Sequence, residues 1–353
     1  MVQCEFIKKD KQRCKRAASS ENGKNLKYCW QHQDSKVLLA RPTSPARPTS
    51  PVKVVPVKVF KNKSYEYSFD RVKDVDKKIT EDTYIIDTNN DIFAVFDGHG
   101  GAKTANLLQN NFISTFEKII DSNIDNKIIT TLKNIEDDIK YMKSGSTAII
   151  ALIDDKNNKI TLANVGDSEA ILIRKNKIIE YTTPHKPTNR RERLRIIFHG
   201  GKIKDGYISN NNMEIGMSRS IGDKQFKTLP EFKGLIADPN IYHWNFKKGD
   251  ILLLASDGVW DTDFKDSKIQ FKDELVNYLI EYPNTTAEDI IQLTLARWAE
   301  YGFLGEGYQP GTEKYNNLSE KSKQLYSDKI SDRAKNISIR KSADDITAIL
   351  IKF

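Results

Sequence analysis

Residues 92–101 have the sequence IFAVFDGHGG, in which five consecutive apolar residues precede an aspartate, a histidine and three glycines. A continuous apolar run ended by glycine predicts a buried strand in a packed core. At the exit of that strand, Asp97 is a candidate metal ligand and His99 a candidate proton donor. Gly98 would let a backbone carbonyl approach a cation. Taken alone, so short a motif is more often a strand, a turn and a helix start, so the rest of the chain has to decide.

The chain has 353 residues, enough for one large domain and an appendage. No apolar run approaches the roughly 20 residues of a membrane span, and residues 1–9 lack the apolar core of a secretory signal. All three cysteines precede position 30, which favours a reducing compartment over a disulfide scaffold. We therefore expect an intracellular protein, cytoplasmic or nuclear.

The formal net charge of +8 is concentrated at the N-terminus. Residues 1–63 contain 15 lysines and arginines against 4 acidic residues, whereas the rest of the chain contains 41 against 44. A basic arm of this kind can bind nucleic acid or an acidic partner. A solvated, disordered arm is the more common interpretation of such a composition.

The same N-terminal arm contains candidate zinc ligands in a C-x9-C-x14-C-x2-H series, formed by Cys4, Cys14, Cys29 and His32. Thiolates and imidazoles are the ligands that tetrahedral zinc prefers, and a segment this short and charged could not fold without a metal. The series resembles small zinc knuckles and predicts a structural Zn²⁺ site within residues 1–38. The alternative is three free cysteines in a flexible tail.

The sequence after residue 38 divides into a linker and a main domain. A tandem ARPTSP repeat at 40–51 predicts a semi-rigid, proline-rich linker over residues 39–62. Residues 63–353 then alternate short apolar strands with helical patterns, which predicts an α+β domain with antiparallel sheets. Within it, residues 302–341 are polar and are expected to be an insertion, part loop and part helix.

Turn clusters and apolar periodicity place the elements of this domain. The turn at 87–91 predicts a hairpin between strands 83–86 and 92–96. Thr285 and Glu288 have the spacing of a capping box ahead of a helix near 287–299. The other helices are expected at about 102–118, 126–140 and 188–201.

Acidic residues stand at the ends of four apolar strands. Asp97, Asp167 and Asp257 follow such strands, and Asp344 precedes another. Acidic residues are common at strand ends as caps. Four of them, three close to a glycine, point instead to hard oxygen ligands that converge on a divalent cation such as Mg²⁺ or Mn²⁺.

Six segments of the chain resemble motifs of the type 2C metal-dependent serine/threonine protein phosphatases. In chain order they are IFAVFDGHGG, SGSTAIIALI, LANVGDSEAIL, MSRSIGD, LLLASDGVWD and SADDITAILI. The resemblance extends over roughly residues 65–353. It implies a four-layer α-β-β-α sandwich of two antiparallel sheets flanked by helices, with a binuclear Mg²⁺ or Mn²⁺ centre at one end of the sheets.

The resemblance also implies a role for each matching residue. The reaction would be hydrolysis of phosphoserine and phosphothreonine in proteins by a water or hydroxide held between two metals, in a domain that is usually monomeric. The implied roles are Asp97 bridging both metals, the Gly98 carbonyl, Asp257 and Asp344 as further ligands, Glu81 acting through a water, Asp167 and Asp261 recruiting a third, weaker metal, and His99 as general acid. No cysteine lies in the main domain, so a phosphocysteine mechanism is excluded.

Several positions depart from the family pattern, among them Lys77, Glu169, Asp345 and Pro184, which replaces a usual aspartate. Lys77 stands where an arginine usually binds the substrate phosphate, and lysine loses the bidentate geometry; Arg71 or Lys78 could compensate. Glu169 and Asp345 add negative charge near the expected metals. These departures motivate a second hypothesis, a pseudophosphatase or phosphoprotein-binding module, and a third role is partner binding through the basic arm.

Overall fold

The computed structural model describes residues 20–21, 24–25, 59–62, 64–73, 77, 79–139, 141–210, 212–263, 269–300, 316 and 344–353. The chain forms two compact units, Met1–Pro56 and Val57–Phe353. In the first unit the described residues form a pair of antiparallel strands, β1 (Ser20–Glu21) and β2 (Lys24–Asn25). Cys4, Cys14, Cys29 and His32, residues 39–58 of the linker and nearly all of the 302–341 segment lie outside the described residues, so the expectations for them remain predictions.

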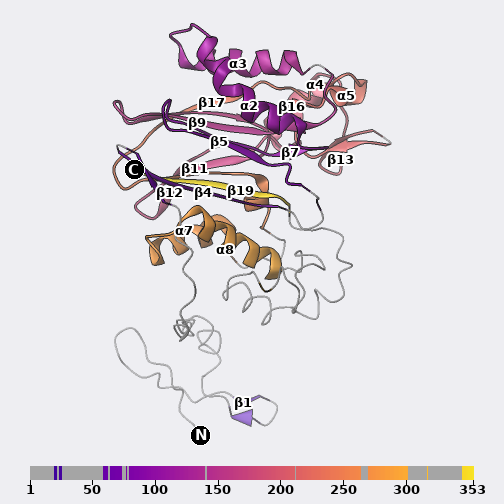
Figure 1. Cartoon of the computed structure of the whole chain (residues 1–353). Helices are drawn as coiled ribbons and strands as arrows, with labels where there is room; N and C mark the ends of the chain where they lie inside the picture. The colour runs from indigo at the N-terminus through magenta and orange to yellow at the C-terminus, as the bar shows by residue number, and fades with distance from the viewer. Residues whose placement is uncertain are drawn as a thin grey trace. The chain divides into compact units, whose positions relative to one another are not determined.

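Two antiparallel sheets form the centre of the second unit (Figure 1). One has five strands in the order β17-β10-β9-β6-β5 and the other has six in the order β12-β11-β18-β19-β4-β3. The strands of the first are β17 (Asn240–Asn245), β10 (Lys159–Val165), β9 (Ala148–Asp154), β6 (Ile92–Phe96) and β5 (Thr83–Asp87). Those of the second are β12 (Lys177–Tyr181), β11 (Glu169–Arg174), β18 (Ile251–Ala255), β19 (Ile346–Lys352), β4 (Glu66–Val72) and β3 (Phe60–Lys61).

Helices cover the outer face of each sheet, giving the layer order α-β-β-α (Figure 1). The five-stranded sheet packs against α2 (Lys103–Lys118) and α3 (Ile124–Asp138), and the six-stranded sheet against α7 (Phe271–Glu281) and α8 (Ala287–Glu300). The sequence of strand β6 is apolar throughout because the strand packs on both of its faces. Ile92, Ala94 and Phe96 face the helices, whereas Phe93 and Val95 face the other sheet, so both faces are buried.

The predicted hairpin is confirmed, because β5 pairs with β6 in antiparallel register from Thr83–Phe96 to Asp87–Ile92. Helix α3 begins at Ile124, two residues earlier than expected. The side chain of Asn123 accepts hydrogen bonds from the amides of Asp125 and Asn126, and this N-cap sets the start of the helix.

The predicted capping box of α8 was wrong by one residue. Thr286 and Asp289 make the reciprocal bonds, with the Asp289 carboxylate 2.8 Å from both the amide and the hydroxyl of Thr286. Thr285 instead donates to the Tyr282 carbonyl. The two Thr-x-x-acid pairs overlap in sequence, and only the tertiary position of the chain selects one of them.

Short elements complete the domain between β12 and β19. They are α4 (Arg190–Phe198), β13 (Ile203–Lys204), β14 (Tyr207–Ser209), β15 (Glu214–Ile215), α5 (Lys224–Lys227), the 3-10 helix η1 (Pro230–Phe232) and α6 (Asp257–Trp260). A further small sheet joins β16 (Ile221–Gly222), β8 (Gly145–Ser146) and β7 (Gly98–His99). The sequence did not predict β4, β17 or α7. Within the described ranges, none of the helices combines the length and hydrophobicity that crossing a membrane requires.

Phe93 tests the interior between the sheets. It is fully buried, with its ring 5.8 Å from that of Tyr65 and 5.4 Å from that of Tyr67. We expect Phe93→Ala to lower the free energy of unfolding in urea by about 3–5 kcal/mol, because the cavity cannot collapse between two sheets. The control Ile120→Ala, at a fully exposed position, should change it by less than about 0.5 kcal/mol. Equal effects of the two variants would contradict this packing.

Candidate active site

The carboxylates that the sequence placed at strand ends lie close together in the fold. Asp97 follows β6 and Asp257 follows β18, while Asp344 precedes β19. Because Ala255 pairs with Ala348, the end of β18 lies beside the start of β19. The pairing of Thr83 with Phe96 likewise places Glu81 beside Asp97. Sheet register therefore gathers residues from positions 81 to 344.

Two glycines allow the backbone to come this close. A Cβ at Gly98 would collide with the backbone carbonyl oxygen of Glu81, and a Cβ at Gly258 would collide with that of Asp345. Gly98 follows Asp97 and lets its segment pack against the segment of Glu81. Gly258 follows Asp257 and lets its segment pack against the segment of Asp345. Close packing is thus a structural reason for the two D-G pairs, beside the access to a cation expected at Gly98.

The gathered carboxylates raise one another's pKa values. Burial, followed by the charges of Asp82, Asp257 and Asp344, raises the pKa of Asp97 well above its usual value. Burial and neighbouring carboxylates also raise the pKa of Asp257. One buried oxygen of each of Asp82, Asp167 and Asp257 has no hydrogen-bond partner among the described residues. Such a cluster holds its protons tightly unless positive charge is supplied.

Two lysines supply part of that charge. The Lys77 Nζ lies 2.9 Å from Glu81, 3.1 Å from Asp344 and 3.3 Å from Asp345. The Lys186 Nζ lies 2.7 Å from Asp261 and 3.9 Å from Asp167. Burial would lower the pKa of each ammonium, but these carboxylates raise it.

With the lysines in these positions, no three His, Cys, Asp or Glu side chains of the described residues already converge in a metal-ligand arrangement. The donor set nevertheless fits a hard divalent cation in its chemistry. It consists of carboxylate oxygens, several of them buried without a partner, in a cluster that repels itself. A cation would take over the charge that the lysine ammonium groups now provide.

His99 is held by Asp223, a residue to which the sequence assigned no role. The His99 Nε2 lies 2.6 Å from Asp223 Oδ2, and Asp223 is fully buried at the start of α5. Burial lowers the pKa of His99, but the hydrogen bond and charge of Asp223, followed by the charges of Asp167 and Glu81, raise it overall. The signal in the sequence was the Gly222-Asp223 pair that ends the MSRSIGD segment.

Asp82 and Asp345 form a buried layer behind the candidate ligands. The Asp82 carboxylate accepts a 2.7 Å bond from the Thr347 hydroxyl, and burial raises its pKa to about 7. Asp345 accepts a 2.7 Å bond from the Glu81 amide. Glu81 in turn accepts a 2.6 Å bond from the Gly101 amide. These bonds orient Glu81, and the sequence had treated Asp345 only as additional negative charge.

Glu169 and Arg71 bear on the departures from the family pattern. Glu169 is 6% exposed and pairs with the Lys272 Nζ at 2.7 Å, so its charge is neutralised locally. Arg71 donates a 2.6 Å bond to the Asp82 carbonyl and lies over the Tyr84 ring. Arg71 therefore supports the backbone beside the cluster, and Glu169 faces a lysine of α7.

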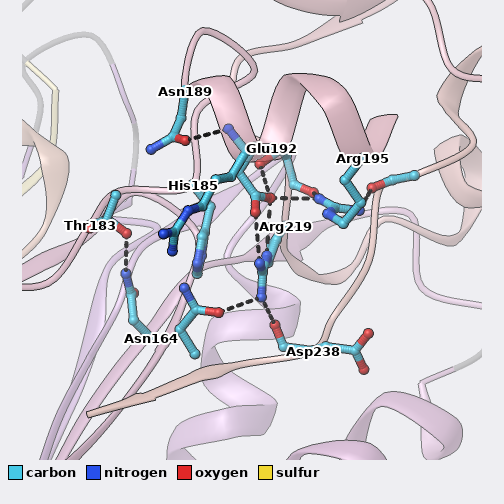
Figure 2. A network of polar contacts seen from close by, with 12 residues as sticks. Asn164, Thr183, His185, Asn189, Glu192, Arg195, Arg219 and Asp238 are labelled. Atoms are coloured by element: carbon cyan, nitrogen blue, oxygen red, sulfur yellow. Dashed lines mark hydrogen bonds and ion pairs between the residues drawn. The ribbon is translucent and has the colours of Figure 1, made fainter. Parts of the chain in front are cut away.

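His185 connects the loop carrying Asp167 to the segment carrying Lys186. It is 1% exposed, and its Nδ1 accepts a 3.1 Å bond from the Gly166 amide (Figure 2). His185 donates its own amide to the Gly166 carbonyl at 3.0 Å. These two bonds bring Lys186 to the same end of the sheets as Asp167 and Asp261.

The chain belongs to the protein phosphatase 2C family, whose model matches residues 67–299. It is 33% identical over 193 residues to protein phosphatase 2C homolog 2 of Aspergillus fumigatus, covering 51% of this chain and 44% of that protein. It is 30% identical over 235 residues to probable protein phosphatase 2C 4 of Paramecium tetraurelia, covering 58% and 76%. The chain spans about half the length of the first curated relatives it matches, 44%, 56% and 54%.

Solved structures share the fold at low sequence identity. A phosphatase from a pathogenic strain of Toxoplasma gondii has a TM-score of 0.56 at 18% identity, with 82% of this chain and 93% of that chain covered. A serine-threonine phosphatase 2C from the same organism has a TM-score of 0.52 at 19% identity, with 85% and 98% covered. The α+β fold expected from the sequence agrees with these neighbours.

The pKa of His185 makes a prediction about stability. Burial and the charge of Arg219 lower this pKa to about 3. An unfolded histidine binds a proton below about pH 6.5, whereas the folded one does not until about pH 3, so this group destabilises the fold progressively as pH falls through that window. We expect His185→Asn, whose side-chain oxygen can still accept from Gly166, to show a shallower fall in the free energy of unfolding between pH 6.5 and 4.5.

Urea denaturation at a series of pH values measures this slope. The exposed His199, changed to Asn, is the matched control and should leave the slope unchanged. Parallel pH curves for wild type and His185→Asn would contradict the buried, neutral state of His185.

Proposed function

We propose that this protein hydrolyses phosphoserine and phosphothreonine in proteins with the help of Mg²⁺ or Mn²⁺. The observation that carries the proposal is the meeting of Asp97, Asp257 and Asp344 at one end of the sheets, beside a histidine fixed by Asp223. Family membership supports a phosphatase activity of this class. The physiological substrates are phosphoproteins whose identity the site does not encode.

The residues proposed to hold two cations are Asp97, the Gly98 carbonyl, Asp257 and Asp344, with Glu81 acting through a water. Asp167 and Asp261 are proposed to hold a third. Two such cations supply a water of lowered pKa and neutralise phosphate charge when they are bound. Two hydrogen bonds hold these groups in place: the Gly101 amide donates to the Glu81 carboxylate at 2.6 Å, and the Asp97 amide donates to Thr147 Oγ1 at 3.1 Å.

His99 is proposed as the general acid that protonates the leaving serine or threonine oxygen. An alkoxide is a poor leaving group, and a raised pKa keeps more of the imidazole protonated near neutral pH. The His99 Nδ1 has no partner among the described residues, while Nε2 is committed to Asp223. The bond from Nε2 to Asp223 therefore orients the imidazole beside the carboxylate cluster.

Lys77 is proposed to bind the substrate phosphate. Its ammonium lies among Glu81, Asp344 and Asp345, which are the groups that a cation would neutralise. Once those carboxylates are neutralised, the ammonium can turn to the phosphate as a single point charge. The zinc site of residues 1–38 and the nucleic-acid or acidic partner of the basic arm remain predictions of the sequence.

Activity on a phosphothreonine peptide with Mn²⁺ tests the proposal. We expect Asp97→Asn to lower kcat at least 100-fold, because it removes the carboxylate proposed to be shared by both cations. His99→Gln should lower kcat by about 10²–10⁴-fold. Asp138→Asn, an exposed carboxylate on α3, is the control and should retain full activity.

A chelator should abolish the activity, and Mn²⁺ should restore it. No hydrolysis by the wild type with Mn²⁺, together with measurable binding of the phosphopeptide, would replace the enzyme by a phosphoprotein-binding module. The neutralisation of Glu169 by Lys272 removes one motive for that alternative.

Lys77→Met separates two effects of one ammonium. Cations no longer have to displace it from three carboxylates, so we expect the Kd for Mn²⁺, measured by calorimetry, to fall several-fold. The KM for the phosphopeptide should rise, because a phosphate contact is lost. The exposed Lys133→Met on α3 is the charge-matched control and should change neither value. Unchanged or weaker Mn²⁺ binding by Lys77→Met would contradict competition at these carboxylates.

A further inference from the structure

A pocket of about 1050 Å³ lies against helix α4, apart from the carboxylate cluster. We call it the α4 pocket. Its wall includes Thr183 and His185 before the helix, and Asn240 and Tyr242 of β17. Arg190, Arg191 and Leu194 contribute the α4 side of the wall. The proposed function uses none of these side chains.

A rigid ion-pair network forms one side of the α4 pocket (Figure 2). Glu192 is 5% exposed and lies 2.6 Å from the Arg195 guanidinium and 2.7 Å from that of Arg219. Burial raises the pKa of Glu192, but hydrogen bonds from Arg219, Arg195 and Ser218 outweigh it and lower the pKa to about 2. Arg219 also donates to the Asp238 carbonyl and the Asn240 side chain, at 2.9 and 3.0 Å.

Arg190 and Arg191 stand on the rim with their charges uncompensated. Both are exposed, and neither side chain makes a hydrogen bond or ion pair with a described residue. They occupy the first two positions of α4 after the N-cap Asn189. Positive charge in the first turn opposes the helix macrodipole, so these arginines cost stability where acidic residues would add it. Residues that oppose a local stability preference, here the preference for acidic side chains in the first helical turn, are often functional when no other contact compensates them.

The α4 pocket is joined to the proposed catalytic centre through one pair of consecutive residues. His185 belongs to the pocket wall, and Lys186 reaches Asp261 at 2.7 Å. The Gly166 amide that bonds His185 directly precedes Asp167. The wall of the α4 pocket and the proposed cation ligands therefore lie on the same two segments, 166–167 and 185–186.

We propose that the α4 pocket binds acidic residues that flank the phosphorylated serine or threonine of the substrate. This inference rests on the proposed function. Four arginines and one glutamate line the pocket, so its wall has an excess of positive charge that attracts carboxylates. Leu194, 59% exposed beside them, adds an apolar contact for a neighbouring side chain. A concave site next to a catalytic centre suits a peptide segment better than a flat, anionic lipid surface.

Two phosphothreonine peptides that differ only in three flanking glutamates or glutamines test this inference. We expect the wild type to prefer the acidic peptide by roughly tenfold in kcat/KM at low salt, and less at high salt. The glutamates are moved along the peptide to find the preferred position. Arg190→Glu/Arg191→Glu should reduce the preference to about one or reverse it. These changes place acidic residues at a helix N-terminus, so loss of folding is not expected.

Arg193→Glu is the matched control. Arg193 lies on the same helix, is exposed and makes no described ion pair, but it does not line the α4 pocket. It should keep the preference for the acidic peptide. A wild-type preference near one, or an equal loss in Arg193→Glu, would overturn the proposal.

Binding separates this inference from the proposed function. If the wild type hydrolyses neither peptide, the phosphatase proposal fails, and fluorescence anisotropy of the labelled acidic peptide still tests the pocket. Binding that Arg190→Glu/Arg191→Glu abolishes and Arg193→Glu preserves would support the pocket on its own. Cosedimentation with phosphatidylserine vesicles that needs Arg190 and Arg191, with no difference between the peptides, would assign the arginines to a membrane surface and overturn the proposal.

Discussion

Repulsion among buried carboxylates is the constraint on which the candidate site depends. Asp97 and Asp257 lie so close to other acidic residues that burial and charge raise the pKa of both. A fold tolerates such a cluster only if the carboxylates keep their protons or positive charge lies among them. In this structure the ammonium groups of Lys77 and Lys186 supply positive charge, and in the proposed enzyme divalent cations would replace them. Metal binding and stability of this end of the sheets are therefore coupled.

Packing of the two sheets stabilises the fold enough to hold this unfavourable cluster. Strands such as β6 and β18 are apolar on both faces, one against helices and the other against the opposite sheet. The hydrophobic free energy gained by burying these strands on both faces offsets the free-energy cost of the carboxylate cluster. The acidic residues follow immediately where the strands end. Gly98 and Gly258 then let the neighbouring segments approach closely.

The segment between β12 and β16 relates to the site in a different way. Its centre is the buried Glu192, whose pairing with Arg195 and Arg219 is structural because Glu192 accepts from both and each arginine also donates to a backbone carbonyl. That rigid base presents Arg190 and Arg191, which are not satisfied. Arg190 and Arg191 therefore differ from Arg195 in having no partner among the described residues, and from Arg193 in lining the α4 pocket.

Local pattern was enough to predict much of the fold. The 92–96 strand, its hairpin with 83–86 and the strand ends bearing Asp97, Asp257 and Asp344 all follow from apolar runs, turn residues and glycine. Strand β4 was missed although its first five residues, EYSFD, alternate strictly between polar and apolar, which is a strand signal. The capping box of α8 was misplaced because two overlapping pairs satisfy the same pattern.

The sequence by itself determined which residue types stand at the strand ends, and with them the family and the donor chemistry. Only the tertiary structure decided the pairwise relations: Asp223 behind His99, Lys272 on Glu169, Lys77 among three carboxylates and the open pocket beside α4. These contacts join residues up to 268 positions apart. Periodicity is a local property, whereas the register of two packed sheets decides which distant side chains meet.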